Sequence, residues 1–303
     1  MALMELGEKN KEVVVVCADL SESTRVLEFK EKYPERFVEI GVAEQNLATV
    51  ASGLAAVGKI PFITSYATFS PGRNNEQIRT TISLNKVPVK IGGMHAGISV
   101  GPDGATHQAL EDMALMRVQP NMTVISPCDA EEARKATIAA AAHAGPVYLR
   151  FSREKTPLIT TPETPFVLGQ VQIMWLPEKP RVAVFATGPL VYNVLRAVDE
   201  LEHEIPTSVL NVHTIKPLDK KAIVEAAKTA GGVVVVEEHQ VAGGLGSAIA
   251  EVLAEEWPVP MQFVGVRDQF GQSGEPKELI EHYGLGITHI KQAISRVHAR
   301  AHI

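Results

Sequence analysis

The sequence predicts an α/β protein with two doubly wound domains, each built on a mostly parallel sheet. Three observations carry this prediction: apolar, β-branched runs recur along the chain, helical patterns separate them, and a proline-containing stretch divides the pattern into two parts. Several runs are apolar at successive positions, as strands covered by helices on both faces should be. At about 100–200 residues per domain, the chain of 303 residues has room for two domains.

Residues 1–155 are predicted to form the first domain around a parallel sheet. Its expected strands are 13–18, 37–39, 61–64, 87–92, 123–126 and 147–150. Its expected helices are 44–57, 75–84, 108–117 and 130–143. Asp129 is placed to cap the last of these helices. Residues 2–7 are expected to be the last turns of a helix that stops at Gly7.

Residues 156–180 are predicted to form a linker, because Pro157, Pro162 and Pro165 interrupt a stretch without periodicity. The alternation of strands and helices then restarts. Residues 181–303 are therefore predicted to form a smaller, mostly parallel C-terminal domain. Its expected strands are 182–186, 208–211, 233–237 and 261–264, and its expected helices are 193–202, 219–230 and 246–255.

Composition and charge exclude several classes of protein. The net charge of −6 argues against a nucleic-acid binder, which would need a basic face. The longest purely apolar run, 13–18, is far shorter than the roughly 20 residues that span a bilayer. Glu5, Glu8 and Lys9 exclude a secretory signal at the start. We therefore expect a cytoplasmic protein without a membrane or nucleic-acid partner. Two cysteines are too few for a disulfide framework or a zinc site.

The first candidate for chemistry is Glu44, in the segment Gly-Val-Ala-Glu-Gln-Asn at 41–46. It lies where a strand leads into an apolar helix. A carboxylate at this position meets the positive end of the helix dipole, which is a structural role. The position also suits a carboxyl group held in a dry interface for proton transfer. The local sequence leaves both interpretations open.

The second candidate is a pair of aromatic residues, Tyr66 and Phe69, which follow a strand in a chain with 5% aromatic residues. They are either ordinary core residues or a platform for a flat heterocycle. Arg153 follows the last strand of the domain. It is either a surface arginine or a residue whose planar guanidinium group binds a phosphate.

The most informative segment is the glycine-rich loop 92–108, which carries His95, Asp103 and His107. It follows a strand, and loops at the carboxyl ends of strands hold the sites of α/β folds. No Gly-Lys-Ser/Thr follows, so this is not a Walker-type phosphate loop. Histidines titrate near neutral pH and suit proton transfer to and from a sugar. A metal site is an alternative that this chemistry does not require.

The second domain contains Glu-Glu-His at 237–239 and Gly-Gly-Leu-Gly at 243–246. The glycine segment lacks the full spacing of a dinucleotide-binding motif and the acidic residue that should follow it. We therefore interpret both segments as structural, with the glycines allowing a helix to pack closely on a strand.

Taken in order, these clusters resemble the transketolase family of thiamine-diphosphate enzymes over nearly the whole chain. The matching segments are GVAEQNLA at 41–48, SYATF at 65–69, GPDGATHQ at 101–108, IKPLD at 215–219 and the later EEH and GGLG. The resemblance implies the family's pyrimidine-binding domain followed by its C-terminal domain. The family's Gly-Asp-Gly segment with a later Asn, which holds magnesium and the diphosphate, is not found. The chain thus resembles the C-terminal subunit of a split transketolase.

The resemblance implies four cofactor-binding residues. Glu44 matches the glutamate that hydrogen-bonds the pyrimidine ring nitrogen of thiamine diphosphate and so promotes removal of the thiazolium proton. Phe69 is similar in position to the aromatic residue stacked on the pyrimidine. Tyr66 is expected to line the same pocket, and Asp19 to lie close to the cofactor.

The resemblance also implies residues for the substrate, a sugar phosphate. His95 and His107 match histidines around the donor substrate and, with Glu44, are the expected catalytic residues. Asp103 matches the aspartate that recognises a sugar hydroxyl. Ser23 and Arg153 match the residues that bind the substrate phosphate.

The implied activity is transfer of a two-carbon ketol unit from a ketose phosphate to an aldose phosphate, as in the pentose phosphate pathway. Mg²⁺ and the diphosphate are expected to be held mainly by a separate N-terminal subunit, so no metal ligand is assigned to this chain. The expected assembly is an α2β2 heterotetramer, with helix 44–57 as a candidate contact. The chain alone is expected to be inactive.

Three alternatives remain from the sequence. A 1-deoxyxylulose-5-phosphate synthase has a similar loop but usually an arginine in place of His95. The beta subunit of a 2-oxo-acid dehydrogenase shares the two-domain plan but differs in the loop around His107. A non-catalytic paralogue is the third alternative, against which intact Glu44, His95 and His107 argue.

Overall fold

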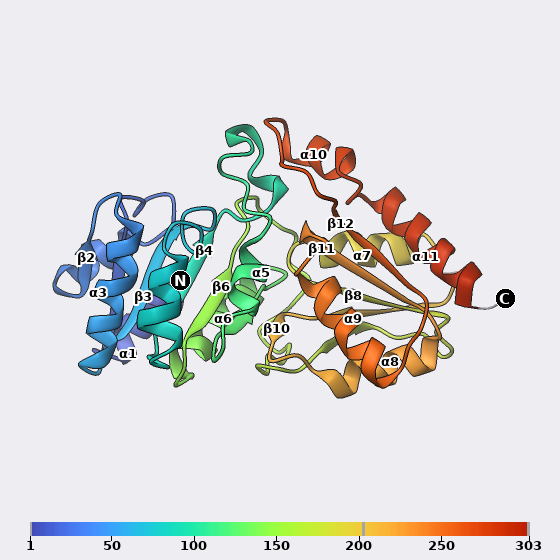
Figure 1. Cartoon of the computed structure of the whole chain (residues 1–303), viewed down its shortest axis with the longest axis horizontal. Helices are drawn as coiled ribbons and strands as arrows, with labels where there is room; N and C mark the ends of the chain where they lie inside the picture. Colours follow the sequence, from blue (N-terminus) through green and yellow to red (C-terminus); the bar gives the residue numbers. More distant parts are fainter. Residues whose placement is uncertain (1, 202–203, 302–303) are drawn as a thin grey trace.

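The structure is a computed structural model that describes residues 2–201 and 204–301. Two α/β units lie side by side, and each has a sheet with helices on both faces (Figure 1). The first sheet has seven strands and the second has five. The predicted fold class, two mostly parallel α/β sheets, is confirmed.

The first sheet is parallel except at one edge, and its order is β10-β5-β6-β4-β3-β1-β2. Its strands are β1 (Val13–Cys17), β2 (Phe37–Glu39), β3 (Ile60–Tyr66), β4 (Lys90–Met94), β5 (Thr123–Ile125), β6 (Val147–Arg150) and β10 (Thr214–Lys216). Because β1, β3, β4 and β6 are parallel, their carboxyl ends meet at one edge of the sheet. The segments around residues 19, 66, 95 and 153 all lie at or just after the carboxyl ends of these strands.

Helices cover both faces of the first sheet, and β1 shows how the sequence divides between them. Val13, Val15 and Cys17 pack with α1 (Ala2–Lys9), α2 (Leu27–Lys32) and α6 (Ala130–Ala142). Val16 points the opposite way and packs with α3 (Glu44–Ala56), η2 (Ile78–Ser83) and α5 (Asp112–Arg117). Each fully buried valine contributes about 1.5–3 kcal/mol. Short helical segments complete this half: η1 (Pro34–Arg36), α4 (Asn75–Gln77) and η3 (Ile98–Asp103).

The second sheet has the order β12-β11-β8-β9-β7, with β7 antiparallel at its edge. Its strands are β7 (Gln172–Trp175), β8 (Val182–Ala186), β9 (Thr207–Asn211), β11 (Val233–Gln240) and β12 (Met261–Val266). One face packs with α7 (Leu190–Asp199) and α11 (Ile287–Ala301), and the other with α8 (Lys220–Ala230) and α9 (Leu245–Glu256). The last helix of this half, α10 (Pro276–His282), lies beside η3 of the first domain.

The expected helix stop at Gly7 is wrong, because α1 continues to Lys9. Gly7 is buried inside the helix, where a Cβ would lie 2.7 Å from the Tyr33 ring and 2.8 Å from the Phe29 ring. The glycine therefore allows α2 to approach α1 closely. Three other helices differ from prediction. The one expected over 108–117 begins at Asp112, and most of 75–84 is a π-helix. The one expected over 193–202 is α7, which begins earlier and ends at Asp199, and residue 202 lies outside the described residues.

Several elements lie where the sequence analysis expected none. They are α2, β7, β10, α10 and α11. The strand β7 falls inside the stretch 156–180, so this stretch is not a linker along its whole length. The strand β10 follows the first strands of the second domain, yet it pairs with β5 and extends the first sheet.

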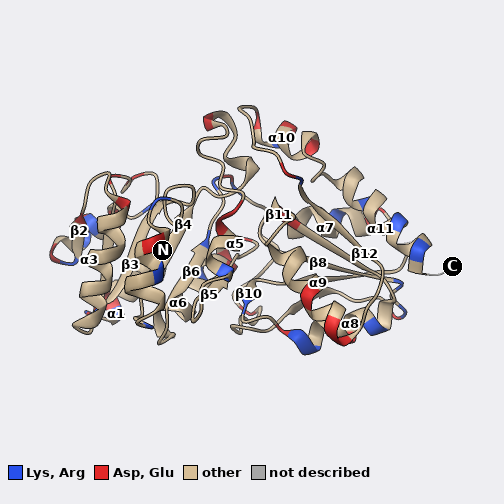
Figure 2. Ribbon diagram, viewed as in Figure 1, with Lys and Arg blue, Asp and Glu red and all other residues tan. Residues whose placement is uncertain are grey.

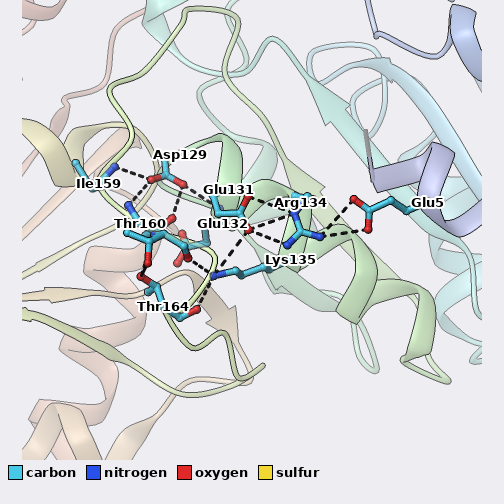
Figure 3. A network of polar contacts seen from close by, with 10 residues as sticks. Glu5, Asp129, Glu131, Glu132, Arg134, Lys135, Ile159, Thr160 and Thr164 are labelled. Carbon is cyan, nitrogen blue, oxygen red and sulfur yellow. Dashed lines mark hydrogen bonds and ion pairs between the residues drawn. The ribbon is translucent and has the colours of Figure 1, made fainter.

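The stretch after β6 is fastened to α6 by a polar network (Figure 3). Asp129 caps α6 as predicted, accepting from the Glu132 amide at 2.8 Å. Its carboxylate also accepts from the amides of Ile159 and Thr160 and from the Thr160 hydroxyl. Further along α6, Arg134 pairs with Glu131 and with Glu5 of α1. The segment around 159–160 therefore has a fixed position on the first domain.

Charged positions of both signs are spread over the two halves of the ribbon (Figure 2). The exposed side of α8, for example, carries several lysines as well as a glutamate. Within residues 2–201 and 204–301, no helix combines the length and apolar character that a bilayer crossing requires.

Candidate active site

Four of the predicted site residues form one cluster of rings at the carboxyl edge of the first sheet. Tyr66 ends β3, and its ring is stacked on Phe69 with centroids 6.0 Å apart. His95 follows β4, with its ring centroid 4.5 Å from that of Tyr66. His107 comes from the glycine-rich loop and lies 5.3 Å from Phe69 and 6.0 Å from Tyr66. Three separate segments thus bring two aromatic rings and two imidazoles together.

Glu44 begins α3 and reaches the same cluster through an arginine. Its side chain is 5% exposed, and its two carboxylate oxygens lie 3.1 and 3.2 Å from Nη1 of Arg73. The Arg73 guanidinium lies 4.1 Å from the centroid of the Phe69 ring. A flat cation therefore stacks on Phe69 while it pairs with the carboxylate. This combination of stacking and hydrogen bonding also suits a flat aminopyrimidine.

No role was predicted for Arg73 from the sequence. The spacing of four residues between Phe69 and Arg73 could have indicated their contact, because side chains at i and i+4 lie close together in a helical turn. Asn74 was also missed. It is fully buried, and its Nδ2 donates to the Glu44 carbonyl at 2.9 Å and to the Ser70 hydroxyl at 3.1 Å. Asn74 thus ties the first turn of α3 to the segment that carries Phe69.

His95 lies among charged groups that control its protonation. Burial lowers the pKa of His95, and the positive charges of Arg153 and Arg25 lower it further. Asp103 and a hydrogen bond to the Ser23 backbone act in the opposite direction on this pKa. The net lowering keeps the imidazole neutral at pH 7, where one ring nitrogen donates and the other accepts.

The predicted substrate residues Asp103 and Arg153 are paired with each other. Nη1 of Arg153 lies 3.2 Å from Oδ1 of Asp103 and donates to the Val100 carbonyl at 2.9 Å. Both side chains are about one-third exposed, so each keeps polar atoms that can reach a ligand. On the loop, Nδ1 of His107 lies 2.8 Å from the Thr106 hydroxyl, which orients the imidazole.

Asp19 is the predicted residue least connected to this cluster. It follows β1 with φ of +57°, and its amide donates to Glu39 at 2.7 Å. Among the described residues, no hydrogen bond joins its side chain to the four rings. Over the same part of the chain, no group of three or more His, Cys, Asp or Glu side chains is arranged to hold a metal ion.

Comparison with known families gives matches over both halves of the chain. Residues 1–158 match the family model described as "Transketolase, pyrimidine binding domain", and residues 169–290 match "Transketolase, C-terminal domain".

Two relatives match the chain almost from end to end. The 6-deoxy-6-sulfo-D-fructose transketolase subunit SqwH of Clostridium sp. (strain MSTE9) is 40% identical over 98% of this chain and 92% of its own. A putative transketolase C-terminal section of Methanocaldococcus jannaschii is 42% identical over 93% of this chain and 89% of its own. Among solved structures, a split gene transketolase, an inactive beta4 tetramer, aligns with a TM-score of 0.92 at 44% identity, covering 99% of this chain and 96% of that one.

Proposed function

The chain belongs to the transketolase family, and from that premise we propose that it is the C-terminal subunit of a split, thiamine-diphosphate-dependent transketolase. It transfers a two-carbon ketol unit from a ketose phosphate to an aldose phosphate together with a separate N-terminal subunit. One observation carries the proposal furthest: the buried Glu44 carboxylate and the Phe69 ring already hold a flat cation between them.

The residues present fit the pyrimidine end of thiamine diphosphate. Phe69 offers a ring face, and Glu44 offers a carboxylate shielded from water at the positive end of α3. When bound, the cofactor supplies the carbanion chemistry of ketol transfer. Glu44 would hold a proton against the pyrimidine ring nitrogen, and Tyr66 would close the pocket beside Phe69. Asp19 would contact the cofactor from the end of β1.

The same edge of the sheet would hold the sugar phosphate. His95, neutral at pH 7, and His107 would exchange protons with the carbonyl and hydroxyl groups of the substrate. Asp103 would accept a hydrogen bond from a sugar hydroxyl. Arg153 would bind the terminal anionic group with its guanidinium, aided by Ser23.

The active enzyme would be an assembly of two kinds of subunit. The N-terminal subunit would hold Mg²⁺ and the diphosphate, and the two kinds would form an α2β2 heterotetramer. The similar structure, a beta4 tetramer that is inactive, supports the expectation that this chain is inactive alone. The relative named as a transketolase subunit supports the need for a partner. The α3 helix is the proposed contact at the two-fold axis.

Reconstitution tests this function. The purified chain is mixed with the candidate N-terminal subunit of the same organism, thiamine diphosphate and Mg²⁺. Ketol transfer is then assayed from xylulose 5-phosphate, or from 6-deoxy-6-sulfofructose as in the sulfo-sugar relative, to ribose 5-phosphate. We expect transfer with one of these donors, loss of it in Glu44→Ala, and wild-type rates in Glu76→Ala, an exposed glutamate of α4. Turnover of pyruvate instead would favour a 1-deoxyxylulose-5-phosphate synthase, and activity that survives Glu44→Ala would refute the proposal.

A further inference from the structure

The glycine-rich segment 97–108, called here the substrate loop, carries Asp103 and His107. It lies between the two domains, next to the segment that leads into α10 (Figure 1). Three of its glycines, Gly97, Gly101 and Gly104, have φ between +75° and +93°. Glycine adopts positive φ values readily, but it also makes the loop backbone more flexible than other residues would. Contacts with neighbouring elements therefore help to fix the loop; in the first domain, Arg153 pairs with Asp103 and donates to the Val100 carbonyl, and the second domain adds two more contacts.

Glu238, near the end of β11 in the second domain, makes the first of these contacts. Its Oε1 accepts from the Ser99 amide at 2.6 Å, and its side chain is 2% exposed. Nη2 of Arg150 donates to the Glu238 carbonyl at 2.9 Å, which fixes the strand end against β6. A Cβ at Gly97 would lie 2.4 Å from the Glu238 carboxylate, so the loop needs glycine there to reach it.

A second contact comes from the segment before α10. Nε2 of Gln108 donates to the Gln272 carbonyl of this segment at 3.0 Å, and to the Ile98 carbonyl within the loop itself at 3.0 Å. The segment also lies against two loop glycines: a Cβ at Gly104 would lie 2.6 Å from the Ser273 hydroxyl, and one at Gly101 would lie 3.2 Å from the Gly274 carbonyl. The substrate loop is thus held by the second domain at two points, its start through Glu238 and its end through Gln272.

We propose that the second domain positions the substrate loop for sugar binding and that Glu238 is its main positioning residue. This inference rests on the proposed function. Glu238 does not touch the rings of the site and takes no part in the chemistry. It fixes the Ser99 amide and thereby the loop backbone that presents Asp103 and His107. Glu44 and Phe69 lie on other elements, and the loop meets Phe69 through the His107 ring, so loss of the Glu238 contact should weaken sugar binding more than cofactor binding.

The chain offers a matched control in the adjacent residue. Glu237 is equally buried at 2%, and its carboxylate accepts from the amides of Leu245 and Gly246, each at 2.8 Å. It therefore caps α9 within the second domain and does not contact the loop. Removing either carboxylate loses a buried acceptor, but only Glu238→Ala frees the substrate loop.

The kinetic test compares the variants in the reconstituted enzyme. We expect Glu238→Ala to raise the KM for the donor sugar about tenfold, since it deletes a buried hydrogen bond to the Ser99 amide. The Kd of thiamine diphosphate should change less than this KM. Glu238→Gln should restore most of the KM, because an amide oxygen still accepts from Ser99. Glu237→Ala should leave the KM unchanged. Equal effects of Glu237→Ala and Glu238→Ala on the KM would overturn the proposal.

Amide hydrogen exchange tests the same contact without any activity. Glu238→Ala should speed exchange across 97–108, and Glu237→Ala should speed it only at the start of α9. Gly97→Ala, which pushes on the carboxylate from the loop side, provides a second variant with the same expected loop exchange. Wild-type exchange across 97–108 in both Glu238→Ala and Gly97→Ala would overturn the proposal. If the wild-type assembly transfers no ketol unit, the proposed function fails, and the exchange result still decides the positioning role.

Discussion

Arg73 occupies the place where the cofactor's pyrimidine is proposed to bind, so its removal should tighten cofactor binding. The guanidinium pairs with Glu44 at 3.1 Å and stacks on Phe69 at 4.1 Å. A pyrimidine that stacks on Phe69 and bonds Glu44 must displace it. The Arg73→Ala variant has no such contacts to break when the cofactor binds.

The size of the effect follows from the two contacts. A cation over an aromatic ring at an exposed site contributes about 0.5–1 kcal/mol. An exposed ion pair contributes about 0.2–1 kcal/mol, and the Arg73 side chain is 51% exposed. Together the two contacts contribute about 0.7–2 kcal/mol that cofactor binding must offset. Losing them lowers the Kd of the cofactor about three- to thirtyfold, at 1.4 kcal/mol per factor of ten.

Titration calorimetry of thiamine diphosphate into the assembled subunits measures this Kd. Arg79→Ala is the control, because Arg79 is an exposed arginine of the same segment. We expect tighter binding in Arg73→Ala and unchanged binding in Arg79→Ala. Weaker binding in Arg73→Ala than in Arg79→Ala would refute the displacement argument, since it would mean that Arg73 supports Glu44 in the bound state.

Three further predictions concern stability. Asp112→Ala breaks a buried pair with Arg150 at 2.8 Å and should lower the free energy of unfolding by about 3–5 kcal/mol in urea titrations; a loss below about 1 kcal/mol would contradict this. Burial raises the pKa of Glu237 to about 7, so folding takes up a proton at pH values between about 4.5 and 7. The wild type should therefore lose stability relative to Glu237→Gln as pH rises from 4.5 to 7. Parallel curves of stability against pH for the two proteins would argue against this prediction. Asp129→Ala removes the cap of α6 and the hydrogen bonds to Thr160. It should lower the free energy of unfolding by at least about 1 kcal/mol and speed proteolysis within 156–170. Unchanged cleavage of this stretch would contradict the role of Asp129.

The alternation of strands and helices could be predicted because it depends on local pattern. The strands β1, β8 and β11 are buried on both faces, and that burial appears in the sequence as successive apolar residues. The strand β10 could not be found in this way. It has three residues, and it forms only because β5, about ninety positions earlier, offers it an edge. The missed α11 did carry a signal, since its buried residues Ile290, Ile294 and Val297 recur at helical spacing.

The residues of the candidate site could be named from motifs, but their connections could not. The motifs contain Glu44, Phe69, His95 and His107, and the fold brings these residues to one edge. Arg73 joins Glu44 across 29 positions of sequence, and neither residue's local pattern indicates this pairing. The contact between Ser99 and Glu238 spans 139 positions and two domains. Contacts of this kind depend on tertiary packing, which a periodicity argument cannot supply.

Glu44 has the central role toward the cofactor in the proposed reaction. The direct measurement is exchange of the thiazolium C2 proton of thiamine diphosphate with deuterium, in the assembled subunits, with cofactor binding measured separately. The wild type should exchange this proton much faster than the free cofactor does. Glu44→Ala should bind the cofactor through the partner subunit yet exchange at the rate of free cofactor. Wild-type exchange in Glu44→Ala with the cofactor bound would contradict the account.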